Sequence, residues 1–257
     1  MKRLILIFIL FICFQYSFSE KTKSEIAYFP NERIDFSLKY GIFKIGEAQF
    51  EFNSDPKVAG GFIHADAKSS RLMKLFKNIH FRYECCIDTL TGLPISDKRI
   101  LIEGDYVDES TVYYDHKSRK DSSLVYSKKT GTLAVPKNVY DLLSGFYHYR
   151  VSYLGDNLPL NHTVTTKTFF IDKVWDLIIR YCGKELINTK YGHVECLKVK
   201  PVTVVGHFFQ TSDAMTIWFA NSGKYLPVKF SIDLNLGTLN GEITSYKSNN
   251  PIIKSKL

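Results

Sequence analysis

The sequence predicts an all-β fold, mostly antiparallel, in which a curved sheet closes toward an incomplete barrel or a sandwich and one helix near residues 138–152 packs on it. Three observations predict this class. Aromatic residues are abundant, with 19 Phe and 16 Tyr among 257 residues, and aromatic side chains are enriched in strands. Apolar and polar residues alternate with a period of two over much of the chain. Short connections join these segments, which favours antiparallel pairing.

The first nineteen residues have the layout of a secretory signal peptide. Lys2 and Arg3 form a basic start, and residues 4–14 are an apolar run. Ser17 and Ser19 then offer small side chains before a cleavage point. Because the apolar run is too short to span a bilayer as a permanent helix, we expect an exported protein that resides in the periplasm or outside the cell.

Cleavage after the signal peptide at residues 1–19 would leave three parts. We expect a polar lead-in over 20–31, a single β-rich domain over 32–247 and a C-terminal tail over 248–257. Lipidation at Cys13 is a weaker alternative to simple secretion, because a bulky isoleucine precedes it where a lipoprotein site has a small residue.

Strand patterns begin soon after the lead-in. Ile34, Phe36 and Leu38 alternate with polar neighbours, as expected of a strand with one buried face. The same alternation predicts strands at 33–40, 47–52, 62–69, 79–88, 95–103, 106–116 and 122–127.

Residues 138–152 carry the helical pattern. Apolar residues and one arginine recur there at helical spacing, namely Leu142, Leu143, Phe146, Tyr149 and Arg150. Asn138 can cap the start of this helix, and its apolar stripe should lie on the sheet. Strand patterns then resume at 162–171, 175–182, 184–189, 192–200, 215–220, 227–234 and 238–246.

The chain is basic, with a net charge of +8 that the loss of Lys2 and Arg3 would lower by two. A basic surface either keeps a protein soluble or attracts anionic lipid headgroups or acidic polysaccharide. The sequence contains no arginine-rich block and no recognised nucleic-acid-binding motif, so we expect no nucleic-acid partner.

Four cysteines follow the leader, and the strand patterns predict their environments. Cys85 continues the apolar set of its strand and should be buried, whereas Cys86 should face outward. A bond between Cys182 and Cys196 is an alternative whose register is open, because Gly183 is a candidate bulge. No spacing matches a zinc site or a redox CxxC, so we expect free or structural thiols.

The sequence lacks the common catalytic motifs. Its seven histidines form no HExxH, and it has no GxSxG elbow and no phosphate-binding loop. Glu47 and Glu51 lie two pleats apart on one strand face, where paired acids could act in a glycosidase, although outer strand faces commonly carry acids for solubility. We expect no catalytic residues, no metal and no cofactor.

A segment at residues 71–77 breaks the strand alternation and predicts a helical turn or a loop. Apolar residues flanked by basic residues either contact a membrane or form a lid over an apolar cavity. The alternative that we favour is a hydrophobic plug at one end of the barrel. The residues concerned are Arg71, Met73, Lys74, Leu75, Phe76 and Lys77.

Five sequence stretches follow one another in a familiar order. They lie at residues 38–52 (LKYGIFKIGEAQFEF), 81–95, 135–150, 187–201 and 213–230 (DAMTIWFANSGKYLPVKF). Together they resemble the DUF3108 family of exported bacterial proteins. The resemblance implies a β-rich envelope protein of a Gram-negative bacterium and supplies no catalytic residues. In general layout, the chain is also similar to periplasmic lipid carriers of the LolA/LolB type, which is an analogy of fold alone.

The first functional hypothesis is a non-enzymatic protein that binds a lipid or another apolar ligand inside the curved sheet. The alternatives are an envelope scaffold that docks partner proteins around a solid core and, with less support, a cell-wall or polysaccharide hydrolase with a polar cleft. The inward-facing candidates for ligand binding are Phe36, Leu38, Phe81, Tyr83, Phe230 and Ile232.

Overall fold

The computed structural model describes residues 31–55, 60–75, 77–202, 213–235 and 237–248. The predicted signal peptide, nearly all of the lead-in and all but the first residue of the tail lie outside these residues.

Within the described part of the chain, fourteen strands form one antiparallel sheet. The strand order is β8-β7-β6-β5-β4-β3-β2-β1-β14-β13-β12-β11-β10-β9. The first half contains β1 (Glu32–Tyr40), β2 (Phe43–Asp55), β3 (Gly60–Ser69), β4 (Ile79–Asp88), β5 (Pro94–Glu103), β6 (Tyr106–Asp115), β7 (Ser122–Ser127) and β8 (Gly131–Pro136). The second half contains β9 (Thr163–Phe170), β10 (Lys173–Thr189), β11 (Gly192–Pro201), β12 (Met215–Ala220), β13 (Pro227–Leu234) and β14 (Gly237–Ser248).

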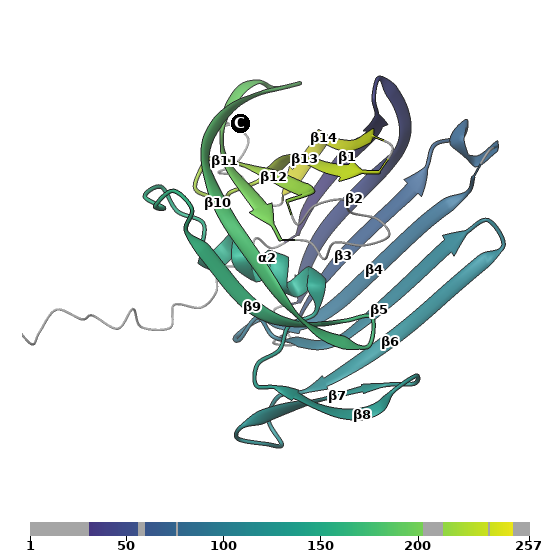
Figure 1. Ribbon diagram of the computed structural model, residues 1–257, viewed down its shortest axis with the longest axis vertical. Coiled ribbons are helices and arrows are strands. Elements are labelled where there is room, and N and C mark those ends of the chain that lie inside the picture. The colour runs from purple at the N-terminus through teal and green to yellow at the C-terminus, as the bar shows by residue number, and fades with distance from the viewer. Residues whose placement is uncertain (1–30, 56–59, 76, 203–212, 236, 249–257) are drawn as a thin grey trace, which may run out of the picture.

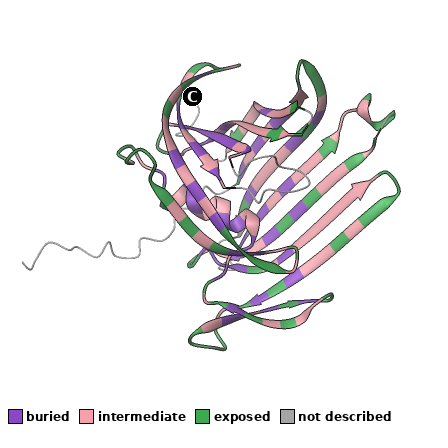
Figure 2. Ribbon diagram, viewed as in Figure 1, coloured by how far each residue is buried: buried purple, intermediate pink, exposed green. Residues whose placement is uncertain are grey.

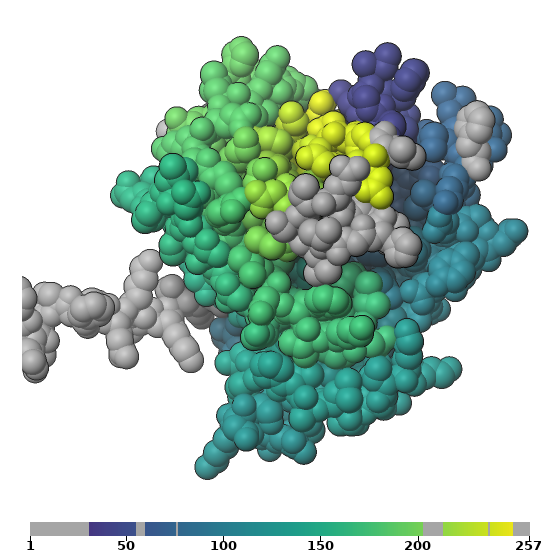
Figure 3. Space-filling model, in the orientation of Figure 1, coloured from purple at the N-terminus to yellow at the C-terminus, as the bar shows by residue number. Residues whose placement is uncertain are grey.

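The sheet curls into a nearly closed barrel around helix α2 (Leu142–Ser152) (Figure 1). The chain leaving β8 reaches the opposite end of the sheet, where Tyr140 bridges Thr168 of β9 in parallel. The turn after β7 also meets the turn after β9, because the hydroxyl of Ser127 donates to Asp172 over 2.9 Å. In Figure 3 the teal and green surfaces of these two ends lie against each other. The predicted curved, largely antiparallel fold is therefore confirmed.

Alternation of buried and more exposed residues runs along the strands (Figure 2). In β1, Ile34 and Phe36 are buried, and Asp35 between them is less so. The buried residues form contiguous apolar clusters, one over β1, β2 and β10–β14 and another in which Tyr149 of α2 packs on β10, β11 and β12. The helix is thus buried on the concave side of the sheet.

Two elements differ from the sequence prediction, and a third agrees with it. Strand β8 was not among the predicted strands. Two predicted strands form the single strand β10, in which a register shift between Tyr181 and Lys184 places Gly183 in the bulge that the sequence suggested. The segment at 71–77 contains the short 3₁₀ helix η1 (Met73–Leu75), in agreement with the predicted turn.

The helix begins later than predicted, and its cap is a different residue. Asn138 has a φ of 57°, in the left-handed region, and is not part of the helix. Asp141 is the N-cap, and its carboxylate accepts hydrogen bonds from the backbone N–H groups of Leu143 and Ser144. Both residues are suitable N-cap types, so composition alone did not separate them.

The four cysteines in the described residues are free thiols. Cys85 is buried and Cys86 is half-buried, as the alternation predicted. None of the described helices has the length and the apolar composition needed to cross a bilayer.

Candidate functional site

An apolar cavity of about 350 Å³ lies between the concave face of the sheet and α2. Its wall comes from β1, β2, β3, β12, β13 and β14, so it joins the two halves of the sheet. The apolar lining residues are Ile34, Phe36, Leu38, Ala48, Phe50, Ile63, Ala67, Leu143, Phe146, Tyr147, Met215, Ile217, Phe219, Pro227, Phe230, Ile232 and Leu239. The volume falls in the lower part of the range of small-molecule sites, roughly 300–1,000 Å³.

Aromatic packing shapes one wall of the cavity. The ring of Phe36 lies edge-on to Phe50 with centroids 5.8 Å apart, and 5.4 Å from the ring of Phe230. Phe230 faces Gly241 across the β13–β14 pair. A Cβ atom at Gly241 would lie 2.1 Å from that ring. The missing side chain at Gly241 therefore allows the Phe230 ring to lie flat against β14.

Small side chains leave the space that these rings do not fill. Ala48 of β2 and Ala67 of β3 lie directly opposite each other and both line the cavity. A large residue at either position would project into the cavity, because neighbouring inward positions on paired strands point to the same face.

A buried ion pair borders the cavity at the end of α2. The guanidinium of Arg150 donates to both carboxylate oxygens of Glu32, over 2.5 and 2.9 Å. It also donates to the backbone carbonyls of Lys224 and Tyr225. Burial lowers the pKa of Arg150, but the nearby Glu32 carboxylate outweighs it and the net pKa is raised. Arg150 is fully engaged in joining α2 to β1 and the β12–β13 turn, which favours a structural role.

A cluster of buried polar side chains surrounds the start of α2. The hydroxyl of Tyr114 donates to Asp97 over 2.5 Å, and the thiol of Cys85 donates to Asp141 over 2.8 Å. Burial and the nearby Asp141 carboxyl raise the pKa of Asp97 to about 8. Burial, with Asp141, also raises the pKa of the Cys85 thiol. A protonated, buried thiol is a poor nucleophile, so this group does not form a cysteine-based active site.

The structure separates the six candidates for ligand binding into two groups. Phe36, Leu38, Phe230 and Ile232 line the cavity together. Phe81 and Tyr83 of β4 do not line it. Tyr83 instead packs between Phe81 and Phe170, with ring centroids 6.2 and 6.3 Å away. The helix residues and β12 were missing from the candidate set, although the helical spacing of Leu143 and Phe146 was a usable signal.

The segment at 71–77 lies in the connection between β3 and β4, at one end of the sheet. Arg71, Lys74, Leu75 and Lys77 are exposed and Met73 is half-buried, and Phe76 lies outside the described residues. None of the segment's described residues lines the cavity. The favoured hydrophobic plug is therefore wrong for Leu75, whose side chain projects into solvent, and it stays a prediction for the rest of the segment.

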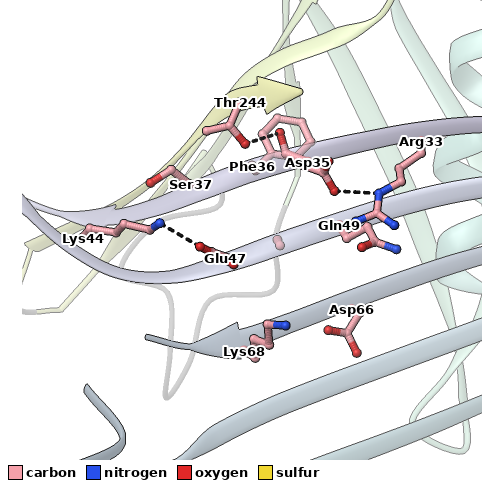
Figure 4. Close-up of a pocket in the computed structure, with 11 residues that line it drawn as sticks. Arg33, Asp35, Phe36, Ser37, Lys44, Glu47, Gln49, Asp66, Lys68 and Thr244 are labelled. Atoms are coloured by element: carbon pink, nitrogen blue, oxygen red, sulfur yellow. Dashed lines mark hydrogen bonds and ion pairs between the residues drawn. The ribbon is translucent and has the colours of Figure 1, made fainter. Parts of the chain in front are cut away.

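A polar groove of about 380 Å³ runs over the outer face of β1, β2, β3 and β14 (Figure 4). Its acids are paired with bases, as the 2.7 Å contact of Lys44 with Glu47 and the 3.0 Å contact of Arg33 with Asp35 show. The hydrogen bond from Lys44 lowers the pKa of Glu47. A general acid needs a raised pKa, so Glu47 is poorly suited to acid catalysis.

A metal site is also missing from the part of the chain that the structure describes. No group of three or more His, Cys, Asp or Glu side chains is arranged there to hold an ion. Several of the described histidines take part in partly buried contacts, such as the 2.6 Å contact of His80 with Asp66.

Comparison with known proteins gives a family and a fold. The family described as "Protein of unknown function (DUF3108)" matches residues 35–244. No curated protein matches the sequence. The chain is similar to the crystal structure of a beta-barrel-like protein of the domain of unknown function DUF1849 from Brucella abortus, with a TM-score of 0.58 and 10% identity over 87% of this chain and 100% of that chain. A hypothetical protein, CT021, from Chlamydia trachomatis has a TM-score of 0.33 and 11% identity over 87% of this chain and 89% of that chain.

Proposed function

The chain belongs to the DUF3108 family, and we propose that it binds an apolar or lipid-like ligand inside its curved sheet, without catalysis, in the periplasm or outside the cell. The observation that carries the proposal is the apolar cavity of about 350 Å³ between the sheet and α2. A scaffold with a solid core has no need of such a space. The proposed location rests on the leader at residues 1–19, and an N-terminus at Glu20 in the exported form would support it.

The chemistry of the wall supports a hydrocarbon ligand. Apart from Glu32, Glu51, Arg150 and the hydroxyl of Tyr147, the lining is apolar, and Arg150 already binds Glu32. The carboxylate of Glu51 is paired with the guanidinium of Arg33 on the neighbouring strand, at a distance of 3.2 Å. A ligand with a charged group inside the cavity would lose hydration without gaining a partner, whereas an acyl chain gains ~0.8 kcal/mol per buried methylene.

The proposal is tested by native mass spectrometry of the protein purified from the cells that naturally produce it. We expect a co-purified apolar ligand in the unaltered protein and its loss from an Ala67→Phe variant, in which the added ring occupies the cavity. Ala134→Phe is the matched control, because Ala134 is exposed on β8. Retention of the ligand by Ala67→Phe, or no ligand under conditions that preserve complexes of known carriers, would count against the proposal.

A homologous series of fatty acids measures the length of the site. Affinity should rise by about fourfold per methylene, because each contributes ~0.8 kcal/mol, until the chain outgrows the cavity. Ala67→Phe should shift that limit to shorter chains. A flat response to chain length in the unaltered protein would show that the cavity does not hold the hydrocarbon.

A further inference from the structure

Four large apolar side chains project into solvent at one end of the sheet. They lie in the connection between β1 and β2, at the first residue of β2, and in the connection between β3 and β4. They are Ile42 (88% exposed), Phe43 (70%), Leu72 (73%) and Leu75 (80%). The two connections are adjacent, because the backbone N–H of Ser70 donates to the carbonyl of Ile45 over 2.7 Å. We call these four residues the apolar tips.

A basic pocket lies beside the apolar tips. It has a volume of about 540 Å³, and its charged lining residues are Lys44, Glu47, Lys68, Arg71 and Lys74. Glu47 is bound by Lys44 at 2.7 Å, as Figure 4 shows together with the adjacent Lys68. Within the described residues, no ion pair joins Lys68, Arg71 or Lys74 to a carboxylate. Among the described residues of this pocket, four bases therefore face a single carboxylate, that of Glu47, next to exposed hydrocarbon.

We propose that this end of the sheet docks onto the surface of an anionic lipid bilayer. The apolar tips enter the boundary between headgroups and acyl chains, and Lys68, Arg71 and Lys74 face the lipid phosphates. Charge complementarity argues for this occupant, because anionic headgroups attract clustered bases while apolar side chains bury in the interface. An acidic protein partner would also attract the bases. The apolar tips, however, project separately into solvent, and each would need its own pocket on such a partner.

The docking end is also close to the proposed ligand cavity along the strands. Leu38 lies four residues before Ile42, and Ala67 lies five residues before Leu72, and both line the cavity. Docking would therefore bring one end of the cavity toward the lipid surface. The docking proposal itself stands on the exposed residues and holds whether or not the cavity contains a ligand.

Vesicle co-sedimentation tests the docking surface. The chain is used as cells process it, with its N-terminus checked by intact mass, because an uncleaved leader would itself enter lipid. We expect binding to vesicles that contain phosphatidylglycerol and much weaker binding to vesicles of phosphatidylcholine alone. Binding to the anionic vesicles should fall as salt rises, because salt screens exposed charges.

Two double variants separate the charge from the hydrocarbon. Arg71→Glu with Lys74→Glu, and Leu72→Ser with Leu75→Ser, should each lower the partition coefficient for anionic vesicles at least tenfold. The matched controls are Lys117→Glu with Lys120→Glu, and Leu160→Ser with Leu186→Ser, which change exposed residues elsewhere. Circular dichroism confirms that each variant is folded.

The proposal is overturned by any of three results. These are no binding of the unaltered protein to anionic vesicles, full binding by both docking-end variants, and an equal loss of binding in the controls. Retention of fatty-acid binding by the docking-end variants, together with loss of vesicle binding, would separate this surface from the cavity.

Discussion

At the scale of single residues, the interior contains polar groups that an all-apolar barrel would not need. The ion pair of Glu32 with Arg150 is nearly inaccessible to solvent, with side-chain exposures of 2% and 4%. Both charges lose their hydration, and the contacts of Arg150 with two backbone carbonyls compensate part of that cost. Such a pair adds little net stability while both partners are present, but it becomes costly when one is removed.

The first prediction concerns this pair. Arg150→Met leaves the Glu32 carboxylate buried without its cation, and we expect it to lower the free energy of unfolding by about 3–5 kcal/mol. The double variant Glu32→Leu with Arg150→Met should recover much of that loss, because it removes both charges. Urea unfolding measures the two values. A double variant no more stable than Arg150→Met would contradict the prediction.

The second prediction concerns the pH dependence of stability through Asp97. Its pKa is raised from 3.8 to about 8 in the folded protein, first by burial and then by the Asp141 carboxyl. The folded state therefore holds the proton more tightly than the unfolded state does. The stability from this group is fully present below pH 3.8, and it is lost as the pH rises through about 8.

Asp97→Asn removes this titration and should flatten the decline in stability toward alkaline pH. We expect the free energy of unfolding near pH 8 to be on the order of a few kcal/mol closer to its acidic value than in the unaltered protein. Urea unfolding across the pH range, with exposed Asp105→Asn as the control, makes the comparison. Equal pH slopes for the unaltered protein and Asp97→Asn would refute the assignment.

At the scale of the elements, the helix shows how a local pattern found the right segment and missed its start. Spacing of Leu142, Phe146 and Tyr149 was enough to predict a helix, because these residues pack on the sheet. Its boundary depended on the tertiary pairing of Tyr140 with β9, where two backbone hydrogen bonds of 2.7 and 2.9 Å hold the chain extended. That pairing joins distant parts of the sequence and leaves no local signal.

The third prediction separates the true cap from the predicted one. Asp141→Ala removes the acceptor for two backbone N–H groups and for the Cys85 thiol, so it should cost about 1–2 kcal/mol or more of unfolding free energy. Asn138→Gly should change stability by only a few tenths of a kcal/mol, because glycine accepts the left-handed backbone at that position. Thermal and urea unfolding measure both changes, and an Asp141→Ala variant as stable as the unaltered protein would contradict the assignment of Asp141 as the cap.

At the scale of the whole molecule, strand alternation predicted most of the sheet but not how its ends meet. The inward positions of β1 and β13 were readable from sequence, and they place Phe36, Leu38, Phe230 and Ile232 around one cavity. The inward position of Tyr83 was read correctly as well, but it packs near the closure, against Phe170. The curvature of the sheet and the position of α2 decide which inward-facing residues line the same cavity. The alternation of apolar and polar residues carries no information on either.

The pairing of β1 with β14 has a consequence for how the chain folds. Contacts such as that of Lys39 with Glu242 join residues 203 positions apart, so the middle of the sheet assembles only after the last strand has been synthesised. Long-range pairing of this kind makes folding slow. The export that we propose would use this delay, because a chain that folds late is still unfolded when it crosses a membrane.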